Sequence, residues 1–597
     1  MGFSKLWPRQ ATREVQVVDE HNASSSDISV IRDGELAYTV AKAGNGSRPA
    51  YQEAAGAPVE SNSPLGYHVG WITVIFLNVN QMIGTGIFST PATVLNRTGS
   101  VGLALIYWAI GVLMAFAGFC VYLELASYFP NRSGSEVVYL EQAFPRPKHF
   151  FPVTFALFTV VLSFSSSNAV VLSQYVWQIA GKTPTDWQLK GVAVAANTLA
   201  TICVIVHNKY SLWATNVIGV IKILTLIFIS ITGLVVLGGN VSRISDPGAN
   251  FRNSFEGTTT NGNDLSVVLV NIIFSYAGYN NAFNMVNEIK NPIKTLKRNG
   301  AISVLIVAVL YMLCNIAYFA AVPKEQFAKS KQIAAGVFFV AVFGKGGAEV
   351  ALNVLVLLSA FGNLLAVLIG QSRLIREVGR QGVLPFTGFW VSTKPFGTPF
   401  GPYFLKWLTT FIMIVAPPAG DAFQFVISLR AYPDGIFQLA MALGVYVIRY
   451  RHKRLGRGAP DFKTWDVALI FYILIQVYVI ATPWIPPKGG PYAGEVSFWY
   501  ATYCVVGIGI IVACALYYVA WMYLLPRWGG YRIRPEISSV DDEGANTHRL
   551  VKVPLDNIAK WDDEHDEAGR LRRRLAARSP RSSQEDGSHG QEEPKVL

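Results

Sequence analysis

Long apolar segments without charge recur along the central part of the chain, more of them than the core of a soluble domain holds. Residues 101–123 and 191–206, for example, contain no Asp, Glu, Lys or Arg. A helix needs about 20 such residues to cross the hydrocarbon core of a bilayer. Charged residues make up only 15% of the chain, whereas a soluble domain carries roughly a quarter. The sequence therefore predicts an α-helical membrane protein.

The predicted fold class is an all-α polytopic membrane protein with about twelve transmembrane helices. The apolar runs between polar breaks cover residues 69–94, 101–128, 151–180, 186–207, 212–238, 265–287, 299–321, 347–370, 403–418, 433–450, 465–486 and 499–524. The flanking regions are polar, which is typical of disordered chain. We therefore predict a largely disordered N-terminal tail at 1–66, a transmembrane domain at 67–525 and a largely disordered C-terminal tail at 526–597.

Lys and Arg are distributed unevenly between the two sides of the predicted spans. With the N-terminal tail in the cytoplasm, nineteen of them flank the spans on that side and eleven on the other. Cytoplasmic loops of membrane proteins carry an excess of Lys and Arg. We therefore expect both tails in the cytoplasm, and we ascribe the net charge of +12 to these loops rather than to a nucleic-acid surface.

The first predicted span contains small and polar residues at mid-membrane depth, within the segment 80–88. Gly84 and Gly86 weaken a helix there, because Gly costs about 1 kcal/mol relative to Ala. A break would free backbone N–H groups at the start of the second half-helix, whose positive dipole end suits a carboxylate. Close helix packing through small residues explains this segment equally well.

The sixth span has a similar interruption at 273–281. Spans one and six are five apart, as expected for a 5+5 inverted repeat with discontinuous helices 1 and 6, and paired interruptions indicate the binding site of a transporter. Carbonyls freed in span six could accept hydrogen bonds from an ammonium group. Tyr279, Asn280 and Asn281 could line the site, with interhelical hydrogen bonding as the alternative. An anion site facing a cation site suits an amino acid zwitterion.

Lys222 lies inside the fifth span, roughly 15 Å along the helix from the inner boundary of that span. A charge at that depth costs several kcal/mol unless it is paired or hydrated, so we assign Lys222 the place of a coupling cation. A snorkelling lysine is the alternative. Glu124, Glu136 and Glu288 lie near the inner ends of spans two and six. For these three carboxylates we expect interfacial salt bridges rather than proton coupling.

Four motifs resemble those of the amino acid–polyamine–organocation superfamily, most closely its L-type amino acid transporter branch and, within it, the fungal high-affinity methionine permeases. They are 83–88 in span one, Lys222 in span five, 274–280 with 288–292 at span six, and 371–385 after span eight. The resemblance covers residues 67–525. It implies amino acid transport across a membrane.

The resemblance also implies a role for individual positions. Backbone N–H groups for the substrate carboxylate would come from Thr85, Gly86 and Ile87, and carbonyls for its ammonium from Ile83, Phe274, Ser275 and Ala277, with Phe274 also resembling an aromatic outer gate. Lys222 stands where sodium-coupled relatives bind an ion, which implies sodium independence. Residues 181–186 include no Cys, so we expect no disulfide-linked heavy chain. Ser135 departs from the family pattern, in which Gly is common.

These observations predict a secondary active transporter for neutral L-amino acids in the plasma membrane, with methionine as the expected substrate and proton symport as a hypothesis. The expected partners are the amino acid, membrane lipid and protons. No catalytic residue is expected, because the spans contain no His/Asp/Glu cluster or Ser/His arrangement. No cofactor, metal or nucleic acid is expected either. The alternatives are an amino acid sensor or receptor of the same fold, and a carrier for GABA or a polyamine.

Overall fold

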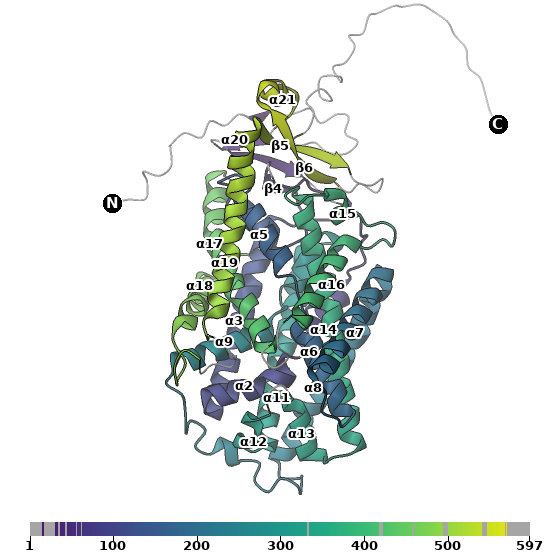
Figure 1. The fold of residues 1–597 in the computed structure, drawn as a ribbon, viewed down its shortest axis with the longest axis vertical. Helices are drawn as coiled ribbons and strands as arrows, with labels where there is room; N and C mark the ends of the chain where they lie inside the picture. The colour runs from purple at the N-terminus through teal and green to yellow at the C-terminus, as the bar shows by residue number, and fades with distance from the viewer. Residues whose placement is uncertain are drawn as a thin grey trace, which may run out of the picture.

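The structure is a computed structural model of the chain. It describes residues 15–16, 30–33, 36–41, 44–54, 56–60, 62–330, 333–416, 422–456, 459–492, 499–539, 546–566 and 569. Helices run along the long axis of the molecule over most of these residues (Figure 1). The predicted all-α polytopic fold class is confirmed.

Ten helical segments among the described residues are long and apolar enough to cross a membrane. Their helices are α1 and α2 (Trp71–Met82, Gly86–Thr98), α3 (Val101–Tyr128), α5 and α6 (Phe150–Val161, Ser166–Ile179), α7 (Asp186–Val206), α8 (Asn208–Leu237), α10, η4 and α11 (Pro292–Thr295, Leu296–Gly300, Ala301–Ala321), α14 (Gly347–Arg380), α17 (Ala422–Arg454), α18 with η5 (Asp466–Ala481, Thr482–Trp484), and α19, η6 and α20 (Thr502–Val519, Ala520–Leu524, Leu525–Gly529). Each overlaps a predicted span.

The sixth and ninth predicted spans correspond to shorter helices. They are α9 (Gly262–Tyr276), which ends at a break before the short helix η3 (Asn281–Glu288), and α16 (Phe400–Val415). The remaining short helices are α4 (Glu136–Ala143), η2 (Ala249–Phe251), α12 (Lys324–Ala328), α13 (Ala334–Phe343), α15 (Thr387–Val391), η7 (Leu555–Asn557) and α21 (Ile558–Glu564). The bundle therefore combines ten span-length segments with two shorter helices at the predicted positions.

Helix α14 continues ten residues beyond the predicted end of span eight at residue 370. Its last turns contain Arg373, Arg376 and Arg380, all of them buried. Hydropathy ends a predicted span at such charges. In the structure they are buried because each forms an ion pair with a carboxylate.

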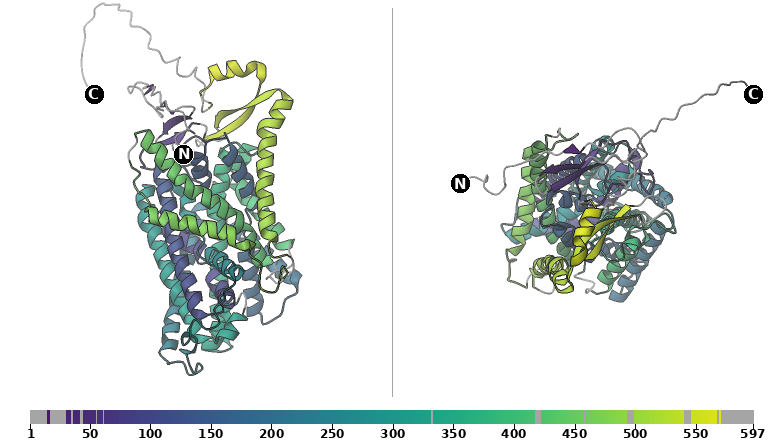
Figure 2. Two further views of the ribbon diagram at one scale, coloured as in Figure 1. Left: turned by 90° about the vertical axis from the view of Figure 1, so that its left-hand side faces the viewer. Right: turned by 90° about the horizontal axis from the view of Figure 1, so that it is seen from above.

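Both predicted tails contain β-strands, which the sequence pattern did not indicate. Strands β1 (Val15–Gln16), β2 (Val30–Asp33), β3 (Leu36–Ala41) and β4 (Ala50–Glu53) form an antiparallel sheet in sequence order, and β5 (Tyr531–Ser539) pairs with β6 (Asn546–Pro554). Both sheets lie at the end of the bundle opposite α12 and α13 (Figures 1 and 2). The rest of the predicted tails lies outside the described residues, and the three regional boundaries stay predictions.

Docking against the helical domain explains why local sequence did not reveal these strands. The N–H of Asn291 donates to the carbonyl of Asn45 at 2.8 Å. The Thr547 hydroxyl donates to the carbonyl of Arg380 at 3.1 Å. Such partners are distant in sequence, so their contribution is invisible to a pattern read along the chain.

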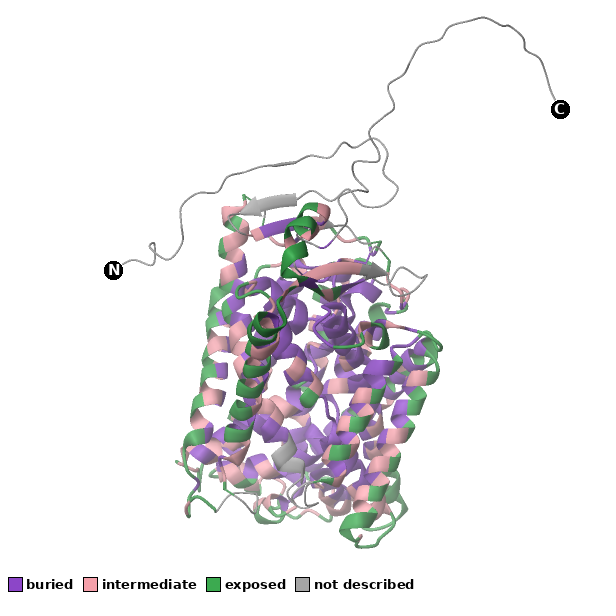
Figure 3. Ribbon diagram, turned by 45° about the horizontal axis from the view of Figure 1, so that its top comes forward, coloured by how far each residue is buried: buried purple, intermediate pink, exposed green. Residues whose placement is uncertain are grey.

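Exposed residues lie on the outer faces of the helices, whereas buried residues concentrate between the helices (Figure 3). Many of the exposed residues are large and apolar. Leu199, Leu234, Leu305 and Leu516 are each more than half exposed. In a membrane protein these positions face lipid, so their exposure carries no penalty. The buried centre contains the two interrupted helices, because α1 packs against α8, α11 and α14, and α2 packs against α9.

Helices α8 and α11 approach each other closely at Gly233. A Cβ on Gly233 would lie 2.1 Å from the Cβ of Ala317. Small residues at such contacts let helix backbones approach in a bilayer, where van der Waals packing is a main source of association.

Gly233→Val is expected to lower the apparent melting temperature of the detergent-solubilised protein, because overpacking of this kind costs about 1–3 kcal/mol. Gly191→Val in α7 is the matched control, since a Cβ there meets nothing within 4 Å. Tryptophan fluorescence during heating measures both variants. Equal melting temperatures for the two would contradict the close packing of α8 on α11.

Candidate substrate-binding site

The first span is broken between Met82 and Gly86, where α1 ends and α2 begins. Among the described residues, no oxygen accepts a hydrogen bond from the N–H groups of Thr85, Gly86 or Ile87. These groups form the N-terminal end of α2, which carries the positive end of the helix dipole. The N–H groups at the first break are therefore available to an anion, and their role in binding a carboxylate stays a prediction.

The carbonyl groups at the end of α1 differ from these amides, because side chains of the protein donate hydrogen bonds to them. Lys222 donates to the carbonyls of Asn80 at 2.9 Å and Ile83 at 2.6 Å. Asn363 Nδ2 lies 3.1 Å from the Asn80 carbonyl and 2.5 Å from that of Gln81. The Tyr311 hydroxyl lies 2.6 Å from the Met82 carbonyl. Within the described part of the chain, the broken first span thus leaves the N–H groups at the start of α2 free and the carbonyls at the end of α1 occupied.

The sixth span is broken between Tyr276 and Asn281, where α9 ends and η3 begins. Gly278 has φ +124°, and a Cβ there would lie 2.6 Å from Cγ of Gln81, so only glycine fits this turn. Among the described residues, no group donates a hydrogen bond to the carbonyl of Ala277. The second break therefore offers an acceptor at the negative end of the α9 dipole.

The two breaks lie against each other. A Cβ on Gly86 would lie 2.8 Å from Cα of Ser275, and the hydroxyls of Thr90 and Ser275 are 2.7 Å apart. The amide end of α2 therefore adjoins the carboxyl end of α9. The N–H groups that start α2 and the carbonyls that end α9 therefore lie side by side, and their roles as anion and cation sites stay predictions.

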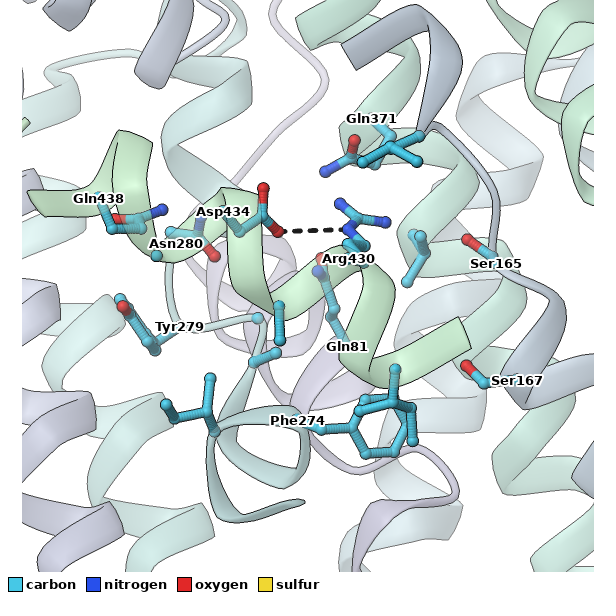
Figure 4. Close-up of a pocket in the computed structure, with 18 of the residues that line it drawn as sticks. Gln81, Ser165, Ser167, Phe274, Tyr279, Asn280, Gln371, Arg430, Asp434 and Gln438 are labelled. Carbon is cyan, nitrogen blue, oxygen red and sulfur yellow. Dashed lines mark hydrogen bonds and ion pairs between the residues drawn. The ribbon is translucent and has the colours of Figure 1, made fainter. Parts of the chain in front are cut away.

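A cavity of about 230 Å³ opens beside the breaks. Its size is below the range that drug-sized ligands occupy, so it suits a small solute. Its lining combines the polar residues Gln81, Asn168, Asn363, Gln371, Gln438 and Gln476 with the apolar residues Met82, Met114, Phe155, Phe158, Leu162, Phe164, Ile273, Val367, Ile427, Phe437 and Val479. Figure 4 shows part of this lining.

Five of the eight predicted substrate-binding residues line the cavity, namely Thr85, Gly86, Phe274, Ala277 and Asn280. The other three are Ile83, Ile87 and Ser275, which are buried outside its lining. The Ile83 carbonyl accepts from Lys222 at 2.6 Å, and the Ser275 carbonyl lies 3.1 Å from the Tyr311 hydroxyl. The roles of all eight residues in substrate binding stay predictions.

Lys222 is buried, with 1% of its surface exposed. Its ammonium lies between α8 and the end of α1, held by the two carbonyls already described. A snorkelling lysine would extend toward the membrane surface, so the burial contradicts that alternative. An ammonium held by carbonyl oxygens has the surroundings of a bound cation, and the role in coupling stays a prediction.

An ion pair in the cavity wall was missed by the sequence analysis. Arg430 Nε lies 3.4 Å from Oδ2 of Asp434 on α17, and Arg430 Nη1 donates to the carbonyl of Phe164 at 3.2 Å (Figure 4). Span ten was predicted to start at residue 433, which put Arg430 in an outer loop. The spacing of four residues between opposite charges in an apolar segment was the available signal.

The three singled-out carboxylates differ in their partners. Glu124 pairs with Arg449 at 2.6 Å and Glu288 with Arg373 at 3.0 Å, which confirms the predicted salt bridges. The prediction is wrong for Glu136, which forms no ion pair with any described residue. Its carboxylate instead accepts hydrogen bonds from neutral donors.

Buried ion pairs close the end of the bundle that bears the two sheets. Arg132 Nη2 lies 2.7 Å from Oε1 of Glu377 and also pairs with Glu141, while Arg376 pairs at 2.9 Å with Glu60 of the N-terminal segment. Burial alone would lower the pKa of the Arg132 guanidinium, but the two carboxylates raise that pKa above its ordinary value. Arg132 therefore stays charged, and separating these pairs is costly.

Known proteins are similar in sequence to most of this chain. A family model described as amino acid permease matches residues 69–511. The high-affinity methionine permease of Saccharomyces cerevisiae is 37% identical over 83% of this chain and 86% of its own length. The low-affinity methionine permease of that yeast is 27% identical over 82% and 89% of the two chains. The b(0,+)-type amino acid transporter 1 of Mus musculus is 29% identical over 78% and 90%.

The matched region includes both interrupted helices, Lys222 and the cavity wall on α17. The relatives are permeases and transporters, which confirms the prediction that this chain is a transporter rather than an enzyme. With its multi-pass helical fold, the chain belongs to the amino acid permease family of membrane transporters.

Proposed function

We propose that this protein carries L-methionine across the plasma membrane as a sodium-independent proton symporter, with both termini in the cytoplasm. One observation carries the proposal: the free N–H groups of Thr85 and Gly86 and the free carbonyl of Ala277 occupy the same cavity wall. A free amino acid has one carboxylate and one ammonium group close together, and this wall offers a partner for each.

The backbone binds the part that all amino acids share, so side-chain preference must arise elsewhere in the cavity. Phe155, Phe158, Leu162 and Phe274 make one part of the lining apolar and aromatic. A methionine side chain is unbranched and polarizable, and its sulfur makes favourable contacts with aromatic rings. Methionine also appears in the names of two yeast relatives. Both facts support methionine as the substrate. A polyamine fits less well, because it has no carboxylate for the N–H groups of Thr85 and Gly86 to bind.

Lys222 supports sodium independence. Its ammonium reaches from α8 to the carbonyl end of α1 and donates to oxygens that could otherwise bind a metal cation. Because the fixed charge already satisfies these carbonyls, no sodium ion is needed to hold the two helices together. Transport then requires the cavity to open alternately to each side, and opening toward the sheets requires the Arg132 and Arg376 ion pairs to separate.

Gly86→Val is expected to reduce methionine uptake at least 100-fold while leaving the amount of protein at the cell surface within about twofold. The added side chain meets the backbone of Ser275 and fills the space beside the free amides. Labelled methionine uptake and surface biotinylation measure the two effects, with Gly191→Val as the control. Near-normal uptake by Gly86→Val would contradict the site.

Lys222→Ala is expected to lower the turnover of methionine at least tenfold, because the carbonyls of Asn80 and Ile83 lose their buried donor. The initial rate of uptake at saturating methionine measures turnover, normalised to surface protein. A fully active variant would reduce Lys222 to a structural residue.

Uptake into proteoliposomes is expected to rise several-fold when the outer solution is more acidic than the lumen, and to stay unchanged when choline replaces sodium. Labelled methionine accumulation measures both effects. Uptake that ignores the imposed pH gradient would refute proton symport and favour exchange.

A further inference from the structure

Glu136 is a buried carboxylate in the cavity wall, and no cation among the described residues forms an ion pair with it. The residue is 8% exposed and lines the cavity beside Asn280. Its Oε1 accepts hydrogen bonds from the Tyr122 hydroxyl and, at 2.9 Å, from Asn280 Nδ2. Its Oε2 accepts from the Ser135 hydroxyl. A carboxylate held only by neutral donors can gain or lose a proton without breaking an ion pair.

The hydrogen bonds around Oε1 leave no place for an added proton. A tyrosine hydroxyl has one hydrogen to donate and two lone pairs. The Tyr122 hydroxyl donates to Glu136 and accepts from Asn280 Nδ2 at 3.1 Å and from Gln438 Nε2 at 2.7 Å, so its capacity is filled. The amide nitrogen of Asn280 is a donor only. A proton on Oε1 would therefore point either at the donor Asn280 Nδ2 or at the Tyr122 oxygen, which can accept no further hydrogen bond.

Ser135 makes the other oxygen different. Its hydroxyl has a single hydrogen and two acceptors within reach, Glu136 Oε2 and Asn284 Oδ1, the latter at 2.6 Å. When Glu136 is ionised, the serine donates to it. When Oε2 carries a proton, the acid donates to the serine oxygen, and the serine hydrogen turns to Asn284. Every donor then still has an acceptor, so Oε2 can take the proton.

This change of partner lies between the loop before α4 and the inner half of the broken sixth span. Asn284 and Asn287 belong to η3, which follows the break directly. The Gly134 N–H donates to the carbonyl of Asn284 at 3.2 Å, and the Asn287 N–H donates to the Ser133 hydroxyl at 3.0 Å. Asn280 in turn connects Glu136 to the cavity. A proton at Glu136 thus acts on a segment that begins at the substrate site.

We propose that Ser135 and Glu136 form a proton-operated hydrogen-bond switch that couples proton binding to movement of the inner half of the sixth span. Protonation from the cavity adds one hydrogen to Oε2 and creates the Ser135–Asn284 hydrogen bond, which holds η3 against the loop. Release of that proton to the cytoplasm returns the serine hydrogen to Glu136 and removes the donor to Asn284 Oδ1. One zwitterion and one proton then carry one positive charge inward per cycle.

The titratable groups around Glu136 are compatible with this role. Those that interact with Glu136 are Tyr122 on α3, Tyr139 on α4, Tyr279 in the break, Asp434 on α17 and Tyr472 on α18. The tyrosines are neutral donors and acceptors. Asp434 is the one other carboxylate among them, and it is paired with Arg430. Glu136 is therefore the carboxylate whose proton changes no ion pair.

The switch rests on the proposed function, and one set of proteoliposome assays separates the two. Glu136→Gln fixes the neutral form, so we expect methionine counterflow to persist while the pH gradient no longer raises accumulation and methionine no longer acidifies the lumen. Glu325→Gln removes an exposed carboxylate outside the cavity and is expected to behave as wild type. Asp434→Asn tests the rival carboxylate and is expected to keep its response to the gradient.

Ser135→Ala provides a second test that does not remove the carboxylate. The variant removes both the donor to the ionised carboxylate and the acceptor of the protonated one, so protonation of Glu136 no longer exchanges hydrogen-bond partners, and the pH gradient should raise accumulation less than in wild type. The Ser135–Asn284 bond is also lost, so fewer protons should enter per methionine. A role that is only structural would reduce uptake equally at every pH.

The outcomes distinguish a failure of the proposed transport function from a failure of the Ser135–Glu136 switch. Wild-type protein without methionine counterflow would overturn the proposed function and the switch with it. Wild-type protein that exchanges methionine but ignores the gradient would overturn proton symport and the switch, and leave the substrate assignment intact. Gradient-driven accumulation by Glu136→Gln, or its loss in Asp434→Asn alone, would overturn the switch only.

Discussion

A backbone group without a partner inside a bilayer is expensive, and the rest of this structure depends on how two breaks in membrane helices manage that cost. At the first break, Lys222, Asn363 and Tyr311 satisfy the carbonyl end of α1, whereas the amides that start α2 have no partner among the described residues. At the second, the Ala277 carbonyl is free in the same sense. These N–H groups and this carbonyl lie in one cavity wall, where the carboxylate and the ammonium of a zwitterion can bind them.

The surroundings of the breaks explain why so many residues of the core are polar or small. Asn363 and Tyr311 reach α1 from α14 and α11, and Lys222 reaches it from α8. These side chains fix where the broken helix ends, and glycine at 86 and 278 lets the two breaks meet without an intervening Cβ. Loss of one such support shifts a half-helix end, so effects on transport are expected well away from the substrate.

The parts of the fold that depend on periodicity and composition were predictable, and those that depend on distant partners were not. Span-length apolar runs, the paired glycine interruptions and the depth of Lys222 are all properties of contiguous sequence. The extension of α14 depends on carboxylates that neutralise Arg373, Arg376 and Arg380 from other segments. Glu124 and Glu136 look alike in sequence, and only the fold pairs one with Arg449 and leaves the other among neutral donors. The occupation of the Ile83 carbonyl by Lys222 is likewise a tertiary contact.

The central claim is that backbone groups of the two breaks bind the charged ends of an amino acid. A cryo-electron microscopy structure of the protein with methionine bound tests it most directly. The account predicts the substrate carboxylate within about 3 Å of the Thr85 and Gly86 nitrogens, a hydrogen-bond distance, and its ammonium at a similar distance from the Ala277 carbonyl. A methionine whose carboxylate instead binds Arg430, with the α2 amides still free, would contradict it.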